Sequence, residues 1–245
     1  MPRFFVCREA VDRDGKAIRI EGDDARHIAR SLRMACGDEL TVCDGSSTEY
    51  FCKLERIRDE ECLLSIISEC QSASEPKSKI TLYMAYPKGD KLETVIQKAV
   101  ELGASRIVPF EASRCIKRPK AEKIDKLTAR HQRIADEAAK QCGRAILPEV
   151  SDPKSFKEML SELGEAKLSL LCYEGEEERS LKSALPEIAP ESIAVIIGAE
   201  GGFSKDEAAA MEEKGAVLVS LGKRILRCET APSYVLSAIS YNYEL

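Results

Sequence analysis

Residues 192–207 read SIAVIIGAEGGFSKDE, and this stretch decides the fold class. Its first half is apolar at consecutive positions, which is typical of a parallel strand that helices cover on both faces. Ser204 and Glu207 have the spacing of a capping box, which predicts that a helix begins directly after the glycines. The stretch therefore predicts a strand, a glycine-rich loop and a helix, the repeating unit of an α/β domain.

Strand and helix patterns alternate on both sides of this stretch, from residue 80 to residue 243. In the segment 90–104, Leu92, Ile96 and similar residues recur on one helical face, and Asp90 with Glu93 has capping-box spacing. The alternation predicts strands at 80–88, 105–112, 145–150, 167–174, 192–198 and 216–222, and helices at 90–104, 121–143, 154–164, 204–215 and 231–243. This order indicates a parallel sheet between helices.

The first part of the chain, before residue 71, has a different pattern of predicted elements. From residue 3 to about residue 70, short strand-like runs are separated by turn signals such as DRDG, and one helical segment, 23–34, interrupts them. This pattern favours a small barrel or sandwich that carries a helix. The segment 71–79, QSASEPKSK, has the composition of a linker. We therefore expect two domains, 1–72 and 73–245.

Composition narrows the class of protein. The 245 residues are 44% hydrophobic and 32% charged, an ordinary globular balance, and no apolar run is long enough to span a bilayer. The ten cysteines show no CxxC spacing and the chain has two histidines, so we expect reduced thiols and no metal site. With no signal-peptide pattern, we expect a cytoplasmic protein with no membrane partner.

Positive charge is concentrated in one part of an otherwise acidic chain. The net charge is -5, yet residues 114–133 contain eight Lys and Arg against Glu122 and Asp125, a local balance of +6 (8 − 2). A solvated helix face would look the same. Segregation of this kind also suits a polyanionic partner such as RNA.

Three loops follow predicted strands, and ligands of open parallel sheets bind beyond the carboxyl ends of strands. They are CYEGEEE, GAEGGFS and GKRILRCET. The glycines of the second loop permit close approach of a ligand to the main chain, but their spacing is not that of a dinucleotide site. If the strands before the second and third loops are neighbours, Glu200 faces the segment 227–230 across one cleft. A purely structural glycine turn and a loop pinned by an Arg–Glu pair are the alternatives.

Several separated blocks carry a family resemblance. KGDKLETVIQKAVELG, KIDKLTARHQRIADEAAKQCGR, IGAEGGFS and LGKRILRCETAP, with RFF and HIARSLR upstream, resemble the RsmE family of bacterial 16S ribosomal RNA uridine N3-methyltransferases. The resemblance extends over essentially the whole chain. This chain departs from the family at Ala199, where proline is usual, and at Cys228, where threonine is usual.

The resemblance implies a fold and an activity. The fold would be a PUA-like β-barrel at 1–72 and an α/β SPOUT-type domain with a C-terminal trefoil knot at 73–245. The activity would be transfer of a methyl group from S-adenosylmethionine to N3 of a uridine in 16S rRNA, in the assembled small ribosomal subunit, by a homodimer.

Site residues follow from the same resemblance. The matching cofactor-binding positions are Cys172, Tyr173, Glu174, Ile197, Gly198, Ala199, Glu200, Gly201, Gly202, Leu221, Gly222, Ile225, Leu226, Arg227, Cys228, Thr230 and Ala231. The RNA-binding candidates are Arg3, Arg30, Arg33, Arg114, Lys117, Arg118, Lys120 and Arg130.

Uridine N3 is only weakly acidic, so a base or a cation must assist its deprotonation. Arg227 is the candidate cation, Glu229 the candidate base and Glu200 its competitor, although either acid could instead hold Arg227. The pair Ile225–Leu226 is expected to bury one side of this loop.

Two other functions stay open at this point. A related SPOUT-type enzyme could act on tRNA or on a ribose 2′-hydroxyl, and a non-catalytic RNA-binding or assembly factor could use the basic segment alone. The first differs in the methylated product, and the second would not bind S-adenosylmethionine.

Overall fold

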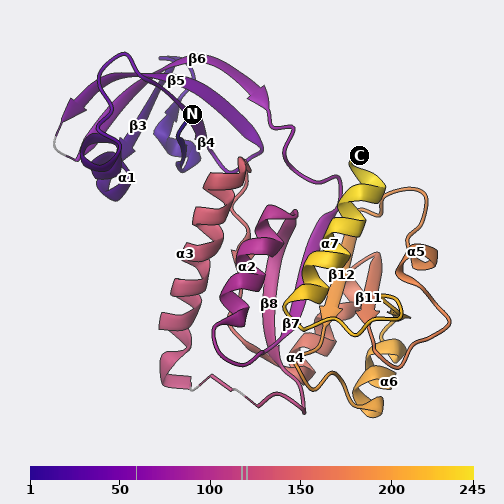
Figure 1. Ribbon diagram of the computed structural model, residues 1–245. Helices are drawn as coiled ribbons and strands as arrows, with labels where there is room; N and C mark the ends of the chain where they lie inside the picture. Colours follow the sequence, from indigo (N-terminus) through magenta and orange to yellow (C-terminus); the bar gives the residue numbers. More distant parts are fainter. Residues whose placement is uncertain (59, 117, 120) are drawn as a thin grey trace. The chain divides into compact units, whose positions relative to one another are not determined.

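The computed structural model describes residues 1–58, 60–116, 118–119 and 121–245. Two compact units share these residues: one contains 1–75 with 139–147, and the other contains 76–138 with 148–245 (Figure 1). The predicted RNA contacts Lys117 and Lys120 lie outside the described residues. Within the described part of the chain, no helix is both long and apolar enough to cross a membrane.

The first unit is a mixed six-stranded sheet with the order β1-β4-β5-β6-β3-β2, in which β1 is parallel to β4 and the other pairs are antiparallel. The strands are β1 (Arg3–Phe5), β2 (Val11–Asp12), β3 (Ala17–Glu21), β4 (Glu39–Cys43), β5 (Thr48–Arg58) and β6 (Glu61–Gln71). The order runs from an edge at β1 to an edge at β2, so the expected barrel takes the form of a sheet. The β5–β6 pair has two register shifts, and irregularities of this kind bend and twist a strand.

Short helical segments complete the first unit. The predicted helix 23–34 begins as α1 (Gly22–Arg26) and continues as a π-helical turn, η2 (His27–Ser31), while a 3₁₀ turn, η1 (Arg8–Ala10), follows β1. Ile28 of η2 is fully buried against the sheet core, together with Leu40 and Leu64. The apolar core of the unit therefore holds α1 and η2, which contribute Ala25 and Ile28 to it.

The second unit is a seven-stranded sheet in which every pair is parallel, with the order β10-β8-β7-β12-β11-β13 and β9 beside β8. The strands are β7 (Lys79–Ala85), β8 (Ala104–Glu111), β9 (Glu149–Val150), β10 (Lys154–Ser155), β11 (Leu168–Cys172), β12 (Ser192–Ile197) and β13 (Ala216–Val219). The helices are α2 (Lys91–Glu101), α3 (Ile124–Cys142), α4 (Phe156–Glu162), α5 (Leu181–Ala184), α6 (Lys205–Glu213) and α7 (Thr230–Tyr243), with 3₁₀ turns η3 (Ala121–Lys123) and η4 (Leu163–Glu165).

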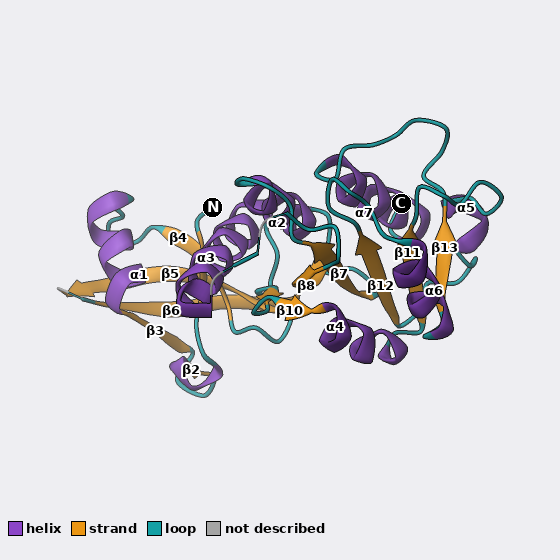
Figure 2. Cartoon of the chain, turned by 90° about the horizontal axis from the view of Figure 1, so that it is seen from below, coloured by secondary structure: helices purple, strands orange, loops and turns teal. Residues whose placement is uncertain are grey.

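Helices cover both faces of this sheet. Residues 193–197 of β12 are all buried, as the unbroken apolar run predicted. The helices α2 and α7 pack against each other on one face, and α4 lies on the opposite face (Figure 2). The predicted α/β class with a parallel sheet is confirmed.

Three local predictions differ from the structure. The strand predicted at 145–150 is reduced to Glu149–Val150. Asp90 precedes α2 but its side chain accepts no capping hydrogen bond, and Glu93 instead pairs with Arg130 at 2.9 Å, so the predicted capping box at α2 is wrong. The strands β12 and β13 are not neighbours, because β11 lies between them. Strand order depends on non-local pairing, so the condition that consecutive strands are neighbours does not hold here.

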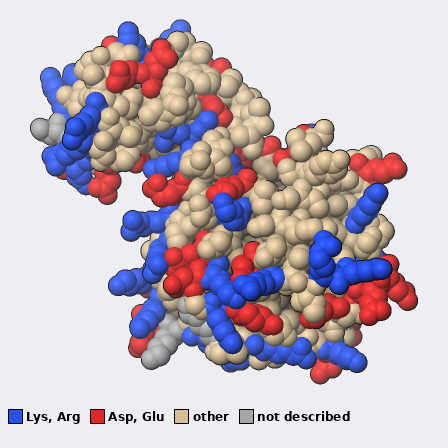
Figure 3. Space-filling model, viewed as in Figure 1, with Lys and Arg blue, Asp and Glu red and all other residues tan. Residues whose placement is uncertain are grey.

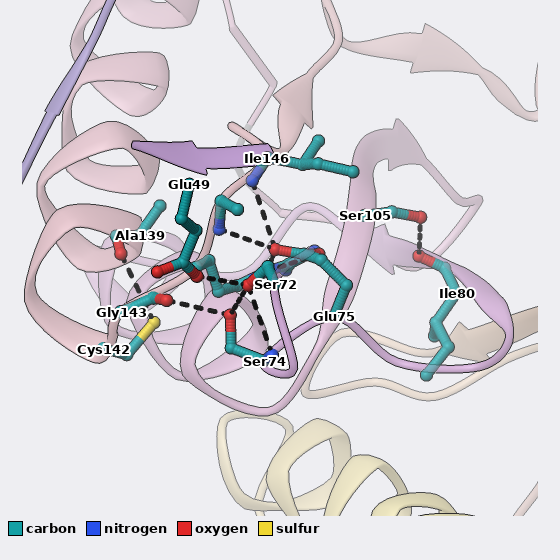
Figure 4. A network of polar contacts seen from close by, with 12 residues as sticks. Glu49, Ser72, Ser74, Glu75, Ile80, Ser105, Ala139, Cys142, Gly143 and Ile146 are labelled. Atoms are coloured by element: carbon teal, nitrogen blue, oxygen red, sulfur yellow. Dashed lines mark hydrogen bonds and ion pairs between the residues drawn. The ribbon is translucent and has the colours of Figure 1, made fainter. Parts of the chain in front are cut away.

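The segment predicted as a linker is held by hydrogen bonds within the first unit. The Glu75 carboxylate accepts from the backbone N–H groups of Ala145 (2.8 Å) and Ile146 (3.1 Å) and pairs with Arg144 at 2.7 Å (Figure 4). The Ser74 hydroxyl donates to the Gly143 carbonyl at 2.8 Å. The side chains of Glu75 and Arg144 are only 13% and 4% exposed. The buried contacts fasten the loop after α3 to the segment after β6.

Candidate active site

Three strands of the parallel sheet end level with one another. Cys172, the last residue of β11, is paired in register with Ile197 of β12 on one side and Val219 of β13 on the other. The loops 173–180, 198–204 and 220–229 therefore leave the same edge of the sheet. The Tyr173 N–H donates to the Val219 carbonyl at 3.2 Å, which ties the first loop to the end of β13.

Tight main-chain packing shapes the glycine loop after β12. A Cβ on Gly198 would lie 3.0 Å from the Gly202 Cα, so a side chain there would collide with backbone. Gly202 has φ +60, and its N–H donates to the Ala199 carbonyl at 2.9 Å in a turn. An added Cβ on Gly202 would meet nothing within 4 Å, so this main chain borders open space. Sterically, the loop needs Gly198 and Gly202 to hold this turn.

The helix α6 begins as predicted. Ser204 is its N-cap, and the reciprocal hydrogen bonds of a capping box to Glu207 are both present. The Glu207 carboxylate also accepts from the Ser113 N–H at 2.7 Å and the Ser113 hydroxyl at 2.9 Å. Burial alone raises the pKa of Glu207, but the hydrogen bonds from Ser113 and Ser204 outweigh it and hold that pKa below its ordinary value. This acid therefore joins the loop after β8 to the start of α6.

The same junction places Arg114 against the glycine loop. Its guanidinium donates to the Gly201 carbonyl at 3.0 Å, and a Cβ on Gly201 would lie 2.9 Å from the Arg114 Cβ. Gly201 thus allows the predicted RNA-binding arginine to lie directly over the loop.

Lys91, at the start of α2, joins the second and third loops. Its ammonium lies 3.0 Å from the Glu200 carboxylate and 3.3 Å from that of Glu229. Glu200 also accepts from the Lys88 N–H at 3.1 Å. The two acids predicted to face one cleft are thus brought together although their strands are not adjacent. The cation between them is Lys91, which sequence reasoning did not select even though it lies in the KGDK block.

Cys228 takes part in this cluster. The residue is 8% exposed, and its thiol donates to the Glu229 carboxylate at 3.3 Å and lies 4.0 Å from the Lys91 ammonium. Burial raises the pKa of the Cys228 thiol to about 12, so it stays protonated and able to donate. The resembled family usually has threonine at position 228. In this chain the Cys228 thiol donates a hydrogen bond from that position to Glu229.

Both acids of the cluster are held as carboxylates. The Glu229 backbone N–H, followed by Cys228 and Lys91, lowers the pKa of Glu229 despite partial burial. For Glu200, burial raises the pKa, but hydrogen bonds from Lys91, from its own N–H and from Lys88 outweigh it, so this pKa is also lowered. A lowered pKa makes a carboxylate a weaker proton acceptor.

The remaining loop residues lie nearer the surface. Arg227 is exposed, and among the described residues its side chain has no ion pair or hydrogen-bond partner. Its carbonyl accepts from the N–H groups of Thr230 (2.8 Å) and Ala231 (3.0 Å) at the start of α7. Ile225 is 81% exposed and Leu226 is half-buried, so the expectation that this pair buries one side of the loop is wrong for Ile225 in the single chain.

The predicted RNA-binding residues fall into two groups. Arg30, Arg33, Arg114, Arg118 and Arg130 are exposed, and Figure 3 shows Lys and Arg side chains along the flank that α3 forms. Arg3 differs, because its guanidinium pairs with Glu49 at 3.0 Å and its side chain is only 15% exposed. A buried, paired guanidinium is a structural element of the first unit, so Arg3 is withdrawn from the set of phosphate contacts.

The chain matches known RNA methyltransferases over both units. An RNA methyltransferase domain model matches residues 74–240, and an RNA methyltransferase PUA domain model matches residues 20–67. Ribosomal RNA small subunit methyltransferase E of Bacillus subtilis is 33% identical over 252 residues, covering 100% of this chain and 98% of that protein. The chain belongs to the ribosomal RNA small subunit methyltransferase E family. The family member from Neisseria gonorrhoeae, solved bound to S-adenosyl methionine, is 28% identical with a TM-score of 0.82, covering 99% of this chain and 98% of that one.

A second solved structure has the same fold as this chain. A methyltransferase from Legionella pneumophila, in complex with the bound cofactor SAM, is 30% identical with a TM-score of 0.85, covering 98% of this chain and 97% of that one. The predicted fold class, a PUA-like unit followed by a SPOUT-like parallel sheet, is therefore confirmed for this family member.

Proposed function

We propose that this protein transfers a methyl group from S-adenosylmethionine to N3 of a uridine in 16S rRNA of the small ribosomal subunit. The observation that carries the proposal is the meeting of Glu200 and Glu229 at Lys91, beside three loops that leave one edge of a parallel sheet. It supports the proposal because it occurs in a chain of the methyltransferase E family, and two similar proteins were solved with this cofactor bound.

The residues at the sheet edge fit the cofactor. S-adenosylmethionine supplies an electrophilic methyl group on a positively charged sulfonium. Glu200 and Glu229, held as carboxylates, provide complementary negative charge, and the open main chain at Gly202 and Gly222 allows close approach. Main-chain groups at the predicted positions in 172–174, 197–202 and 221–231 would hold the cofactor. The knotted path of the C-terminal segment belongs to the same proposal.

Deprotonation of uridine N3 is the step that the protein must assist. Because the pKa values of Glu200 and Glu229 are lowered, we assign these acids mainly to orienting Lys91 and the cofactor. The N3 proton is then lost to water, which frees the N3 lone pair for the methyl group. Arg227 is exposed and has no partner among the described residues, so its charge is available to stabilise the anion that develops on the uracil. Holding N3 in line with the methyl group supplies further acceleration. Since N3 lies on the pairing edge, the target base must be unpaired or extruded.

The proposal also assigns residues to RNA phosphates and to contact with a second copy of this chain. The exposed arginines are assigned to RNA phosphates, which predicts that RNA binding depends strongly on salt concentration; they are Arg30, Arg33, Arg114, Arg118 and Arg130.

The helix α7 exposes Tyr234 (45%) and Tyr241 (75%) seven positions apart, hence on one face, and Ile225 is also exposed. An apolar surface of this kind is typical of a protein–protein contact, and we assign it to the homodimer.

One experiment separates the candidate functions. Purified protein and labelled S-adenosylmethionine are incubated with small subunits from a strain that lacks the modification, and the labelled nucleoside is identified by mass spectrometry. We expect N3-methyluridine. A ribose-methylated product, or label only in tRNA, would assign the protein to another SPOUT activity. Absence of cofactor binding by calorimetry would leave only an RNA-binding role.

A further inference from the structure

A polar pocket lies in the first unit, apart from the residues of the proposed active site. It has a volume of about 420 Å³ and is lined by side chains that include Arg8, Arg13, Asp44, Ser46, Tyr50 and Gln71. All of these residues lie within 1–75, whereas the strand-end loops belong to the other unit. The volume falls within the range of small-ligand sites. Its lining comes from η1, from β2 and the turn that follows it, from the turn before β5, from the start of β5 and from the end of β6.

A buried hydrogen-bonded acid forms the floor of this pocket. Asp44 is 8% exposed; one carboxylate oxygen accepts from the Ser46 N–H at 2.9 Å and from the Ser46 hydroxyl, and the other accepts from the Tyr50 hydroxyl at 3.0 Å. Burial alone raises the pKa of Asp44, but the hydrogen bonds from Ser46 and Tyr50 outweigh it and lower that pKa. The floor is therefore ionised, and the protein already satisfies both of its oxygens.

Two guanidinium groups stand above this floor. Arg13 donates to the Tyr50 hydroxyl at 2.8 Å, and its guanidinium carbon lies 5.9 Å from the centre of the Tyr50 ring. The chain Arg13–Tyr50–Asp44 thus orients Arg13 through a fully buried tyrosine. Arg8 is exposed, and among the described residues its side chain has no hydrogen-bond or ion-pair partner. Guanidinium donors that the protein leaves unused match the geometry of phosphate oxygens.

We infer that this pocket binds one nucleotide of an RNA strand, with its phosphate on Arg8 and Arg13. The lining residues carry two positive charges against one carboxylate whose oxygens are occupied, so the open side favours an anion. The Gln71 amide donates to the Thr48 hydroxyl at 3.4 Å, which leaves its carbonyl oxygen to accept from a ribose hydroxyl or a base edge. The assignment rests on the proposed function only in taking RNA as the source of the phosphate.

Half of the residues that line the pocket lie outside the range that the PUA domain model matches. The PUA domain model matches residues 20–67, whereas Arg8, Arg13 and Gln71 precede or follow that range. None of the three was selected from the sequence, because Arg8 and Arg13 stand singly among acidic residues. Only the folding of β1–β2 and the end of β6 beside Asp44 brings them together.

The test measures binding of a fluorescein-labelled single-stranded RNA to the full-length protein by fluorescence anisotropy over a range of salt concentrations. The variant Arg8→Ala/Arg13→Ala should weaken binding at least tenfold and make the salt dependence shallower, because two phosphate contacts are lost. Arg19→Ala is the matched control: Arg19 lies in the same unit, is exposed and pairs only loosely with Glu21, at 3.8 Å. It should change affinity less than twofold.

A second variant keeps the test independent of folding. Gln71→Glu retains the shape of the side chain and adds a negative charge at the exposed end of β6, so it should weaken RNA binding at least threefold with an unchanged unfolding midpoint. Wild-type affinity in the double variant and in Gln71→Glu, or an equal loss in Arg19→Ala, would overturn the inference. The inference would also be overturned if inorganic phosphate displaced the labelled RNA as well as unlabelled RNA does at the same phosphate concentration. That result would indicate a site for a free anion.

Failure of this inference can be distinguished from failure of the proposed function. The methylated nucleoside and cofactor affinity report on the strand-end loops, whereas anisotropy of the RNA reports on the pocket. Normal RNA binding by the double variant, in a protein that produces N3-methyluridine, would overturn the pocket alone. Loss of RNA binding in the double variant of a protein that methylates another position would support the pocket and overturn the uridine assignment.

Discussion

The Lys91 ammonium lies 3.0 Å from the Glu200 carboxylate, although 109 positions separate the two residues in the chain. The same ammonium lies 3.3 Å from Glu229, so one cation at the start of α2 joins the loops that follow β12 and β13. The pKa of Lys91 is raised, chiefly by its hydrogen bond to Glu200, and it remains charged throughout the physiological range. This triad connects the helical layer to the proposed cofactor site.

Replacing Lys91 with Ala should impair the site more than the fold. Glu200 and Glu229 would lose their shared cation, the pKa of Glu200 would rise, and we expect S-adenosylmethionine to bind at least fivefold more weakly by calorimetry. The ion pairs are partly exposed, so the urea midpoint of unfolding should change little. Lys91→Arg, which keeps the charge, should restore most of the affinity. Parallel losses of affinity and stability in both variants would indicate a structural role only.

Replacing Arg227 with Ala should lower turnover much more than cofactor affinity. The side chain is exposed and has no partner within the described residues, so stability should change by less than about 0.5 kcal/mol. Loss of a group that stabilises developing charge costs about 100-fold in turnover. Turnover on small subunits and calorimetry with the cofactor measure the two effects. Equal losses in both would show that Arg227 only supports the loop.

Replacing Glu207 with Gln should destabilise the start of α6 by about 2 kcal/mol, since this acid accepts charge-assisted hydrogen bonds from Ser113 and Ser204. The wild type should show a matching pH dependence. Because the pKa of Glu207 is lower in the folded protein than in the unfolded chain, its stabilisation is present above the ordinary glutamate pKa of about 4.3 and is lost as the pH falls through the folded value. Urea unfolding at pH 7 and pH 4 should show the variant losing less stability than the wild type.

A methyl group on Gly201 should disturb the glycine loop. The new Cβ would lie 2.9 Å from the Arg114 Cβ and 3.4 Å from the Arg114 carbonyl, so either the loop or the arginine must shift. We expect Gly201→Ala to weaken both cofactor binding and RNA binding at least tenfold, by calorimetry and anisotropy. Gly164→Ala is the control, because its Cβ would meet nothing within 4 Å and its φ is not positive. Wild-type binding by Gly201→Ala would mean that the loop has more freedom than this packing indicates.

Replacing Glu75 with Ala should cost about 3 kcal/mol of stability, because the largely buried Arg144 would lose its 2.7 Å ion pair. Two backbone N–H groups, of Ala145 and Ile146, would also lose their acceptor. Urea unfolding measures the loss. Glu21→Ala removes an exposed acid from the same unit and should change stability by less than about 0.5 kcal/mol. A similar small change in Glu75→Ala would show that water replaces the carboxylate.

Local rules predicted most of the second unit. The apolar run of β12 indicated a strand buried on both faces, and Ser204 with Glu207 indicated the start of α6; both depend on residues close in sequence. The same capping rule was wrong at Asp90, where Glu93 pairs with Arg130 from α3. Tertiary contacts outcompeted the local hydrogen bond there.

The sequence by itself therefore determined the α/β class, the three loops that follow strands, and the acids Glu200 and Glu229, because periodicity and turn chemistry are local properties. Only the tertiary structure decided that β11 separates β12 from β13, that Lys91 rather than Arg227 lies between the two acids, and that Arg3 is buried against Glu49. It also brought Arg8 and Arg13 to the pocket above Asp44. The physical reason is that strand order and ion pairing are set by packing between segments far apart in the chain, which no local pattern encodes.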